Sequence, residues 1–198
     1  MFTPKFIKKH NIKARKQRTS KISKDIAFLL SDVKTFLDVG AFDGMMTKKI
    51  MQGNNKLKGK GIDILVPKKT YVPVKKYNGK KIPYPDKSFD AILLIDVVHH
   101  AENPDALLKE AARVAKKYVI IKDHYYKGFI DKMILSAVDF IGNESFNIKV
   151  KFHFFKIDEW KNILRKNKLK IVNYPIEYNQ KKKDIIGHVL IKVLKVKK

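Results

Sequence analysis

The stretch Phe36-Leu-Asp-Val-Gly-Ala-Phe-Asp-Gly44 decides the fold of this chain. A short apolar run ends at Asp38, two glycines follow, and the next segment, residues 45–51, has the composition of a helix. Glycine has no Cβ and tolerates a positive φ, so the backbone of such a turn can approach a ligand closely. Free N–H groups at the helix start add hydrogen-bond donors. The stretch therefore predicts a nucleotide-like ligand at the carboxyl end of a first strand.

Four apolar runs of the chain each end in an aspartate, at Asp38, Asp63, Asp96 and Asp123. Such runs are typical of strands that are buried on both faces of a parallel sheet, and ligands bind outside the carboxyl ends of these strands. We therefore expect carboxylates to gather at one edge of the sheet, where they suit a ligand with hydroxyl groups or positive charge. The alternative is that each aspartate only caps the turn or helix that follows it.

The rest of the chain alternates between strand and helix patterns, which predicts an α/β fold. Asn103 is placed to cap one of the helices and Pro104 to begin it. The last two strands are close enough in sequence to form a hairpin. We expect strands at about 35–39, 59–64, 71–75, 89–95, 117–122, 169–175 and 187–196, and helices at 23–30, 44–52, from 103 onward, 128–140 and 158–167.

Length and composition indicate a single domain, residues 23–198, preceded by a basic N-terminal tail, residues 1–22. The chain has 198 residues and no cysteine, which excludes disulfides, thiolate zinc sites and cysteine nucleophiles. No apolar run approaches the roughly 18–20 residues that a membrane span needs, and the N-terminus lacks the apolar core of a signal peptide. We expect a cytoplasmic protein.

The charge of the chain is strongly positive, with 44 Lys and Arg against 19 Asp and Glu. Residues 1–24 contain nine Lys or Arg and no acid, and residues 181–198 contain seven Lys and one acid. Basic tails of this kind suggest RNA, DNA or anionic membranes as partners. The alternative is a solvated, lysine-rich surface, since arginine is the better bidentate reader of phosphate and is scarce here.

The order of these motifs resembles that of the class I S-adenosyl-L-methionine (SAM)-dependent methyltransferases. Residues 36–44 resemble the family's first motif, an acid followed by Gly-x-Gly-x-Gly, and residues 61–64 resemble the second. Residues 82–92 resemble its Leu-Pro-Phe-x-Asp-x-Ser-Phe-Asp stretch, and residues 96–100, Asp-Val-Val-His-His, resemble the next strand end. The resemblance implies a Rossmann-like three-layer αβα sandwich with a seven-stranded, mostly parallel sheet whose last strand is antiparallel.

The resemblance also implies a set of residues that bind SAM. Asp63 would bind the ribose hydroxyls and Ile64 would pack on the adenine, while Asp38 would lie near the methionine ammonium group. The spacing along the sequence from Gly44 to Asp63 would also suit a protein that binds NAD. The Gly-x-Gly-x-x-Gly spacing of NAD-binding proteins is absent, however. The predicted cofactor residues are Asp38, Gly40, Ala41, Phe42, Gly44, Asp63, Ile64, Asn78, Gly79, Asp96 and Val97.

Phe42 departs from the family pattern, because it stands where the middle glycine of the first motif is usual. Its side chain could narrow the floor under the methionine part of the ligand, or it could pack beneath the turn. The sequence leaves both possibilities open.

Methyl transfer from SAM would be a direct displacement, and a base is needed only if the acceptor carries its proton. The candidates for this role are His100, His124 and Asp123, with His99 and His153 as further possibilities, because histidine titrates near neutrality. The alternative for the His99-His100 pair is structural. The histidines show no spacing typical of a metal ligand set, so we expect no metal site.

Residues 123–156 are the expected acceptor side, and five aromatic residues there form either an apolar wall or core: Tyr125, Tyr126, Phe152, Phe154 and Phe155. Three functions remain open. The protein methylates a small molecule or metabolite, or it methylates RNA with the help of its basic tails, or it is a non-catalytic SAM-binding or partner protein.

Overall fold

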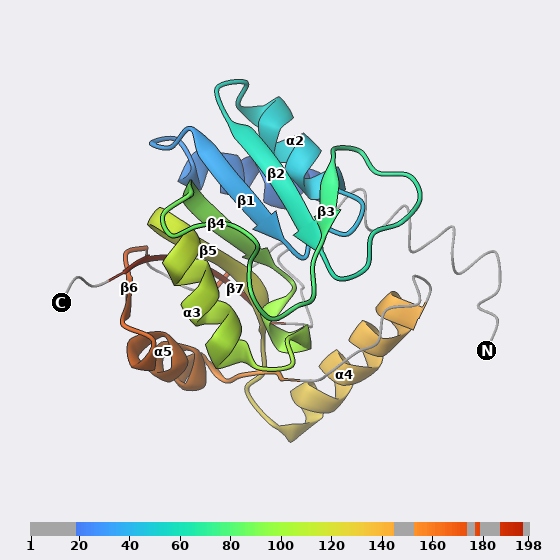
Figure 1. Cartoon of the computed structure of the whole chain (residues 1–198). Helices are drawn as coiled ribbons and strands as arrows, with labels where there is room; N and C mark the ends of the chain where they lie inside the picture. Colours follow the sequence, from blue (N-terminus) through green and yellow to red (C-terminus); the bar gives the residue numbers. More distant parts are fainter. Residues whose placement is uncertain (1–18, 145–152, 174–176, 179–186, 196–198) are drawn as a thin grey trace.

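A seven-stranded sheet with the order β3-β2-β1-β4-β5-β7-β6 forms the centre of the protein (Figure 1). The structure is a computed structural model of the whole chain, and it describes residues 19–144, 153–173, 177–178 and 187–195. The strands β1 to β5 are parallel, and β7 runs antiparallel to both β5 and β6. The strand bounds are β1 Thr35–Val39, β2 Lys58–Asp63, β3 Val74–Lys76, β4 Phe89–Ile95, β5 Ala115–Tyr125, β6 Leu169–Ile171 and β7 Gly187–Lys195.

Helices cover both faces of this sheet, as the resemblance implied (Figure 1). On one face, α3 (Pro104–Val114) and α5 (Ile157–Lys166) bury Leu108 and Trp160 against the strands. On the other face, α2 (Met45–Gly53) and a helix over residues 19–29 bury Ile50 and Ile26. The three-layer αβα sandwich is therefore confirmed. The predicted start of α3 is also confirmed, since the Asn103 side chain accepts a hydrogen bond from the Ala106 N–H at 3.0 Å.

Several element bounds differ from those that the sequence predicts. The strand expected at 71–75 begins only at Val74, because the Tyr71 N–H bonds to the Asp43 carbonyl and Pro73 has no N–H to offer. β5 is longer than expected because its pairing with β7 extends to Tyr125. β6 ends early, at Ile171; the Val172 N–H still bonds to the Lys192 carbonyl, and beyond it the side-chain amide of Asn173 bonds to the Leu190 carbonyl of β7. Residues 174–175 of that expected strand lie outside the described residues.

The first helix and the fourth also differ from expectation. The predicted boundary of the N-terminal tail, residue 22, lies inside the helix over residues 19–29, and Ile22 is buried in the core. α4 (Phe129–Glu144) stands apart from the sheet (Figure 1), and its apolar residues Phe129, Ile130 and Met133 are exposed. Within the described ranges, every helix is too short or too polar to cross a bilayer.

Candidate functional site

The carboxyl ends of β1, β2, β4 and β5 meet at one edge of the sheet, and the four predicted aspartates lie there. Asp38 is the fourth residue of β1, Asp63 ends β2, Asp96 follows β4, and Asp123 lies near the end of β5. The order of the strands places the switch point of the sheet between β1 and β4, where ligands of open α/β sheets bind.

The turn after β1 keeps a left-handed backbone at three of its positions. Gly40, Phe42 and Gly44 have φ values of 81°, 50° and 74°. Phe42 therefore adopts a left-handed conformation that favours glycine, and a side chain there is disfavoured by about 1–2 kcal/mol. The departure seen in the sequence therefore places a side chain at a position whose backbone is left-handed, like that of the two glycines beside it.

Asp38 lies buried beneath this turn. Its side chain accepts a hydrogen bond from the Thr47 hydroxyl at 2.6 Å, and the residue is 2% exposed. Burial, together with the nearby carboxylates of Asp63 and Asp43, raises the pKa of Asp38 to about 7 against the lowering effect of that hydrogen bond. Sequence reasoning missed Thr47, whose only signal is its place one turn into α2.

Asp63 holds the turn closed from the neighbouring strand. One carboxylate oxygen accepts the Phe42 N–H at 2.6 Å and the other accepts the Leu65 N–H at 2.8 Å. Burial raises the pKa of Asp63, and these backbone N–H groups oppose the rise. Asp63, which is predicted to bind the ribose, therefore also ties the turn of residues 36–44 to the end of β2.

The predicted adenine side comes together around Ile64. This side chain is 59% exposed, and a Cβ added to Gly79 would lie 3.1 Å from its Cγ2 atom. The Asn78 side-chain oxygen accepts the Lys80 N–H at 3.0 Å and so shapes the loop. Tyr77, which sequence reasoning missed, donates its N–H to the Asp63 carbonyl, and burial together with the Asp63 charge raises the pKa of its hydroxyl to about 12.

Asp96 and Val97 form the opposite wall of the turn. Asp96 is a second non-glycine residue with positive φ, 52°, and its carboxylate lies 2.6 Å from the Nζ of the fully buried Lys122. The His124 Nε2 is 3.4 Å from the same carboxylate. A Cβ added to Gly40 would lie 2.6 Å from Val97 Cγ2, so the two turns touch where only glycine fits.

Asp123 organises the imidazoles at the end of β5. Its carboxylate is fully buried and accepts the N–H groups of Val98, His99 and His124 at 3.0, 3.3 and 2.7 Å. It also pairs with Nδ1 of the His99 ring. Asp123 therefore holds the start of the short 3-10 helix η1 (Val98–His100), which lies earlier in the chain, and this differs from the alternative that the aspartate caps the turn or helix after it.

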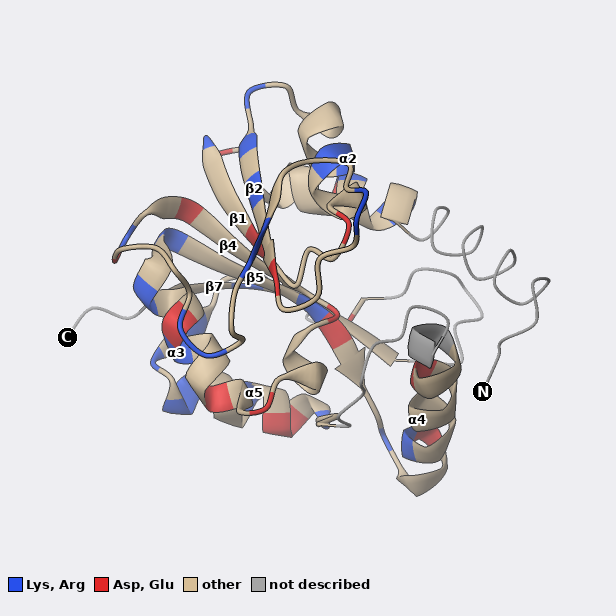
Figure 2. Ribbon diagram, turned by 45° about the vertical axis from the view of Figure 1, so that its right-hand side comes forward, with Lys and Arg blue, Asp and Glu red and all other residues tan. Residues whose placement is uncertain are grey.

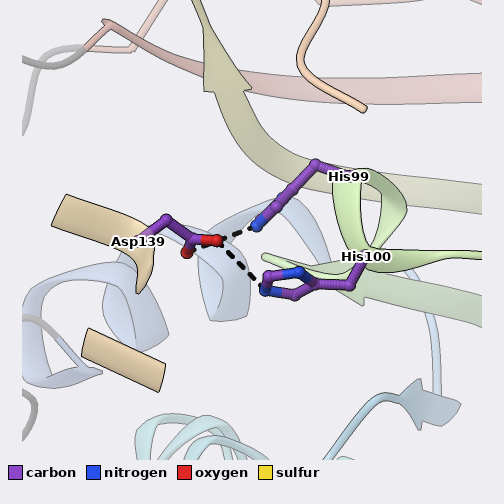
Figure 3. A group of neighbouring side chains, drawn as sticks. All are labelled: His99, His100 and Asp139. Atoms are coloured by element: carbon purple, nitrogen blue, oxygen red, sulfur yellow. Dashed lines mark ion pairs between the residues drawn. The ribbon is translucent and has the colours of Figure 1, made fainter. Parts of the chain in front are cut away.

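The other nitrogen of His99 faces a residue from α4. His99 Nε2 lies 3.6 Å from one carboxylate oxygen of Asp139, and His100 Nε2 lies 3.7 Å from the other (Figure 3). Although burial lowers the pKa of His99, the carboxylates of Asp123 and Asp139 raise it to about 10. Burial and the neighbouring His99 lower the pKa of His100. Sequence reasoning did not single out Asp139. The only sign of it in the sequence is an acidic residue within the apolar pattern of residues 133–141.

The remaining candidates lie around this pair. His124 is buried, and burial followed by the Lys122 charge lowers its pKa well below the ordinary value. His153 is exposed, and its backbone N–H donates a hydrogen bond to the His99 carbonyl.

The aromatic residues of the expected acceptor side divide between site and core. The Phe154 ring stacks on His99 at 5.1 Å between centroids, whereas Phe155 packs on Trp160 in the core. Tyr125 is buried and bonds through its hydroxyl to Glu177, and Tyr126 is half-buried. Phe152 lies outside the described residues.

Comparisons with known proteins agree with this geometry. The profile of a family described as a methyltransferase domain matches residues 14–174. The structure resembles YcgJ from Bacillus subtilis, with a TM-score of 0.66, 15% identity and coverage of 89% of this chain and 99% of that one.

Two further solved structures resemble the fold at 20% identity. For a SAM-dependent methyltransferase from Aquifex aeolicus the TM-score is 0.63, with 99% of this chain and 100% of the other covered. For a possible histamine N-methyltransferase from Thermotoga maritima the TM-score is 0.62, and 90% of each chain is covered. None of the curated proteins compared with the chain matches it.

Proposed function

The chain belongs to the methyltransferase-domain family and is a SAM-dependent methyltransferase, and from that premise we propose that its acceptor is a small molecule bound between η1, β5 and α4. Buried imidazoles and carboxylates at that edge carry the proposal. A small protic acceptor suits such groups, whereas a polyanion requires a run of exposed cations.

The residues of the edge fit the cofactor. Val97 lies so close to Gly40 that the first turn has no room for a side chain at that position, and the carboxylates of Asp38 and Asp63 suit an ammonium group and a ribose diol. We infer that Asp63 accepts from the ribose, that Ile64 and Gly79 flank the adenine, and that Asp38 lies near the ammonium. When bound, SAM supplies a methyl group on a sulfonium that leaves readily.

The cationic groups of the described residues do not gather at this edge. Lysine and arginine are spread over many helices and strands (Figure 2). Lys122, which does lie at the edge, has no exposed surface and pairs with Asp96. This distribution favours a small acceptor over RNA as far as the described chain is concerned; the basic segments 1–18 and 179–186 lie outside it.

The protein then contributes to the reaction mainly by positioning the acceptor against the methyl group of SAM. Proximity and orientation can lower a barrier by about 7–11 kcal/mol in favourable systems. Of the three predicted catalytic groups, His100 has the most exposed side chain, 16%, against 7% for His124 and 0% for Asp123. We infer that His100 faces the acceptor, while Asp123 positions the imidazoles.

The test is transfer of labelled methyl groups from SAM to fractionated metabolites and to RNA, with the full chain. We expect label in a small-molecule fraction. An Asp63→Ala variant should bind SAM more than tenfold more weakly, because it loses more than one ordinary hydrogen bond of about 1 kcal/mol, while Asp158→Ala, at an exposed position of α5, should bind normally. Label in RNA alone would overturn the acceptor class, and normal binding by Asp63→Ala would overturn the assigned role.

A further inference from the structure

Two imidazoles and one carboxylate converge where η1 meets α4 (Figure 3). One nitrogen of His99, one of His100 and a carboxylate oxygen of Asp139 all lie within 4.8 Å of one another. Two histidines and one carboxylate are a ligand set that proteins use for divalent transition metals with open coordination positions. We propose that this triad binds one divalent transition-metal ion.

The surroundings of His99 support a metal ligand more than a core histidine. Asp123 engages its Nδ1, which leaves Nε2 directed at Asp139. A carboxylate on the far nitrogen is the usual outer partner of a metal-binding histidine, because it fixes the tautomer and the ring orientation. The sequence shows no such set, since Asp139 is distant along the chain.

An unsatisfied polar atom also points into the group. The His99 side chain is 1% exposed, and among the described residues its Nε2 makes no hydrogen bond and only lies 3.6 Å from the Asp139 carboxylate. A buried polar atom without a partner costs about 1–3 kcal/mol. A bound cation would remove that penalty, and the carboxylates of Asp123 and Asp139 on either side of His99 favour positive charge there.

The distances need little adjustment for an ion to fit. Ligand bonds of 2.0–2.1 Å at tetrahedral angles would bring the donor atoms to about 3.3 Å apart. His99 Nε2 lies 3.6 Å from one Asp139 carboxylate oxygen and His100 Nε2 lies 3.7 Å from the other, so each imidazole is already close to that value from the carboxylate. The remaining adjustment would fall on the side chain of His100, which is 16% exposed.

The ion would have two consequences for the protein. It would tie α4 to the sheet through Asp139, which matters because most of the apolar side chains of α4 are exposed and Leu135 is its buried apolar anchor. It would also leave a coordination position for an acceptor oxygen, whose proton it would make easier to lose. This second consequence rests on the proposed function, whereas binding of the metal does not.

The experiment is titration of chelator-treated full-length protein with Zn²⁺ by calorimetry, and with Co²⁺ by its visible absorption. We expect one ion per chain. His100→Gln and Asp139→Asn should each weaken binding by more than the roughly 10- to 100-fold that loss of an outer partner costs. His153→Gln removes an exposed histidine beside the group and should leave binding unchanged. Hydrogen exchange of residues 129–141 should slow when Zn²⁺ is added.

SAM binding by every variant, measured in parallel, shows that it has folded. A protein that binds SAM but no Zn²⁺ or Co²⁺ would overturn the metal site and leave the methyltransferase proposal intact. Equal binding by wild type, His100→Gln and Asp139→Asn would overturn it too, because the ion would then lie elsewhere. A loss in His153→Gln as large as in the triad variants would assign the ion to the surface.

Discussion

Asp38 gives the sharpest test of how the cofactor edge is built. Its pKa of about 7 in the folded, cofactor-free protein compares with an ordinary value of 3.8. Because the folded state holds this proton more tightly, the stability that Asp38 contributes is complete below pH 3.8 and is lost as the pH rises through about 7. One pH unit corresponds to about 1.36 kcal/mol, so the whole effect is about 4 kcal/mol.

The perturbation is Asp38→Asn, which removes the titrating proton and keeps an oxygen for the Thr47 hydroxyl. Roughly 3 kcal/mol of the effect falls between pH 5 and pH 8. We expect the free energy of unfolding of the wild type, relative to the variant, to fall by that amount over this range. Urea unfolding without SAM at several pH values measures the difference and cancels the other titrating groups.

Asp90→Asn is the matched control, because backbone N–H groups of Lys34 and Thr35 lower the pKa of Asp90 in spite of partial burial. That carboxylate stabilises the fold above its unfolded pKa and loses its effect only in acid, so its substitution should cost the same at pH 5 and pH 8. If Asp38→Asn also shows a constant difference across this range, the buried carboxyl does not titrate there and the reasoning fails. On the proposed placement, Asp38→Asn should also weaken SAM binding at pH 8, in calorimetry, because the ammonium loses its counter-charge.

Two further substitutions test the contacts between the strand ends. Gly40→Ala places a Cβ 2.6 Å from Val97 Cγ2 at a φ of 81°, so it should destabilise the protein by about 1–3 kcal/mol and weaken SAM binding in calorimetry. The control is Gly128→Ala, whose Cβ meets nothing within 4 Å and should change the free energy of unfolding by less than about 0.5 kcal/mol. Equal effects of the two substitutions would refute the close approach of the turns. Lys122→Met removes the buried partner of Asp96 and should lower the free energy of unfolding in urea by about 3–5 kcal/mol. Adding Asp96→Asn in the double variant should restore most of that loss. If the losses of the two single variants simply add, the pairing is contradicted.

The sequence predicted the strand ends well because their signals are local. A buried parallel strand is a continuous apolar run, and the residue that ends the run must lie at the carboxyl edge. Asp38 and Asp63 were therefore placed correctly, and so was the Asn103 cap of α3. The same reasoning could not give the partners of these carboxylates, such as Thr47 and the Phe42 N–H, because a hydrogen bond depends on the orientation of groups and not only on the run to which they belong.

The Asp139 group shows where such reasoning ends. Apolar spacing correctly predicted a helix in the region of α4, but a spacing rule gives no information about how a helix is placed against the sheet. The exposed side chains of Phe129 and Met133 show that burial does not fix that placement either. Only the structure reveals that α4 brings an acid to His99 and His100.

Phe42 and Asp96 show that the motif is a property of the backbone. Neither residue is a glycine, yet both have a left-handed backbone conformation, with φ values of 50° and 52°. They lie in the turns after the adjacent strands β1 and β4. The conformation costs about 1–2 kcal/mol for Phe42 and less for an aspartate, and in each case a hydrogen bond holds it. The Phe42 N–H bonds to Asp63, and the Asp96 N–H bonds to the Lys122 carbonyl at 2.7 Å. Such strain is typical of functional sites, so the missing glycine is consistent with a turn that still serves the cofactor.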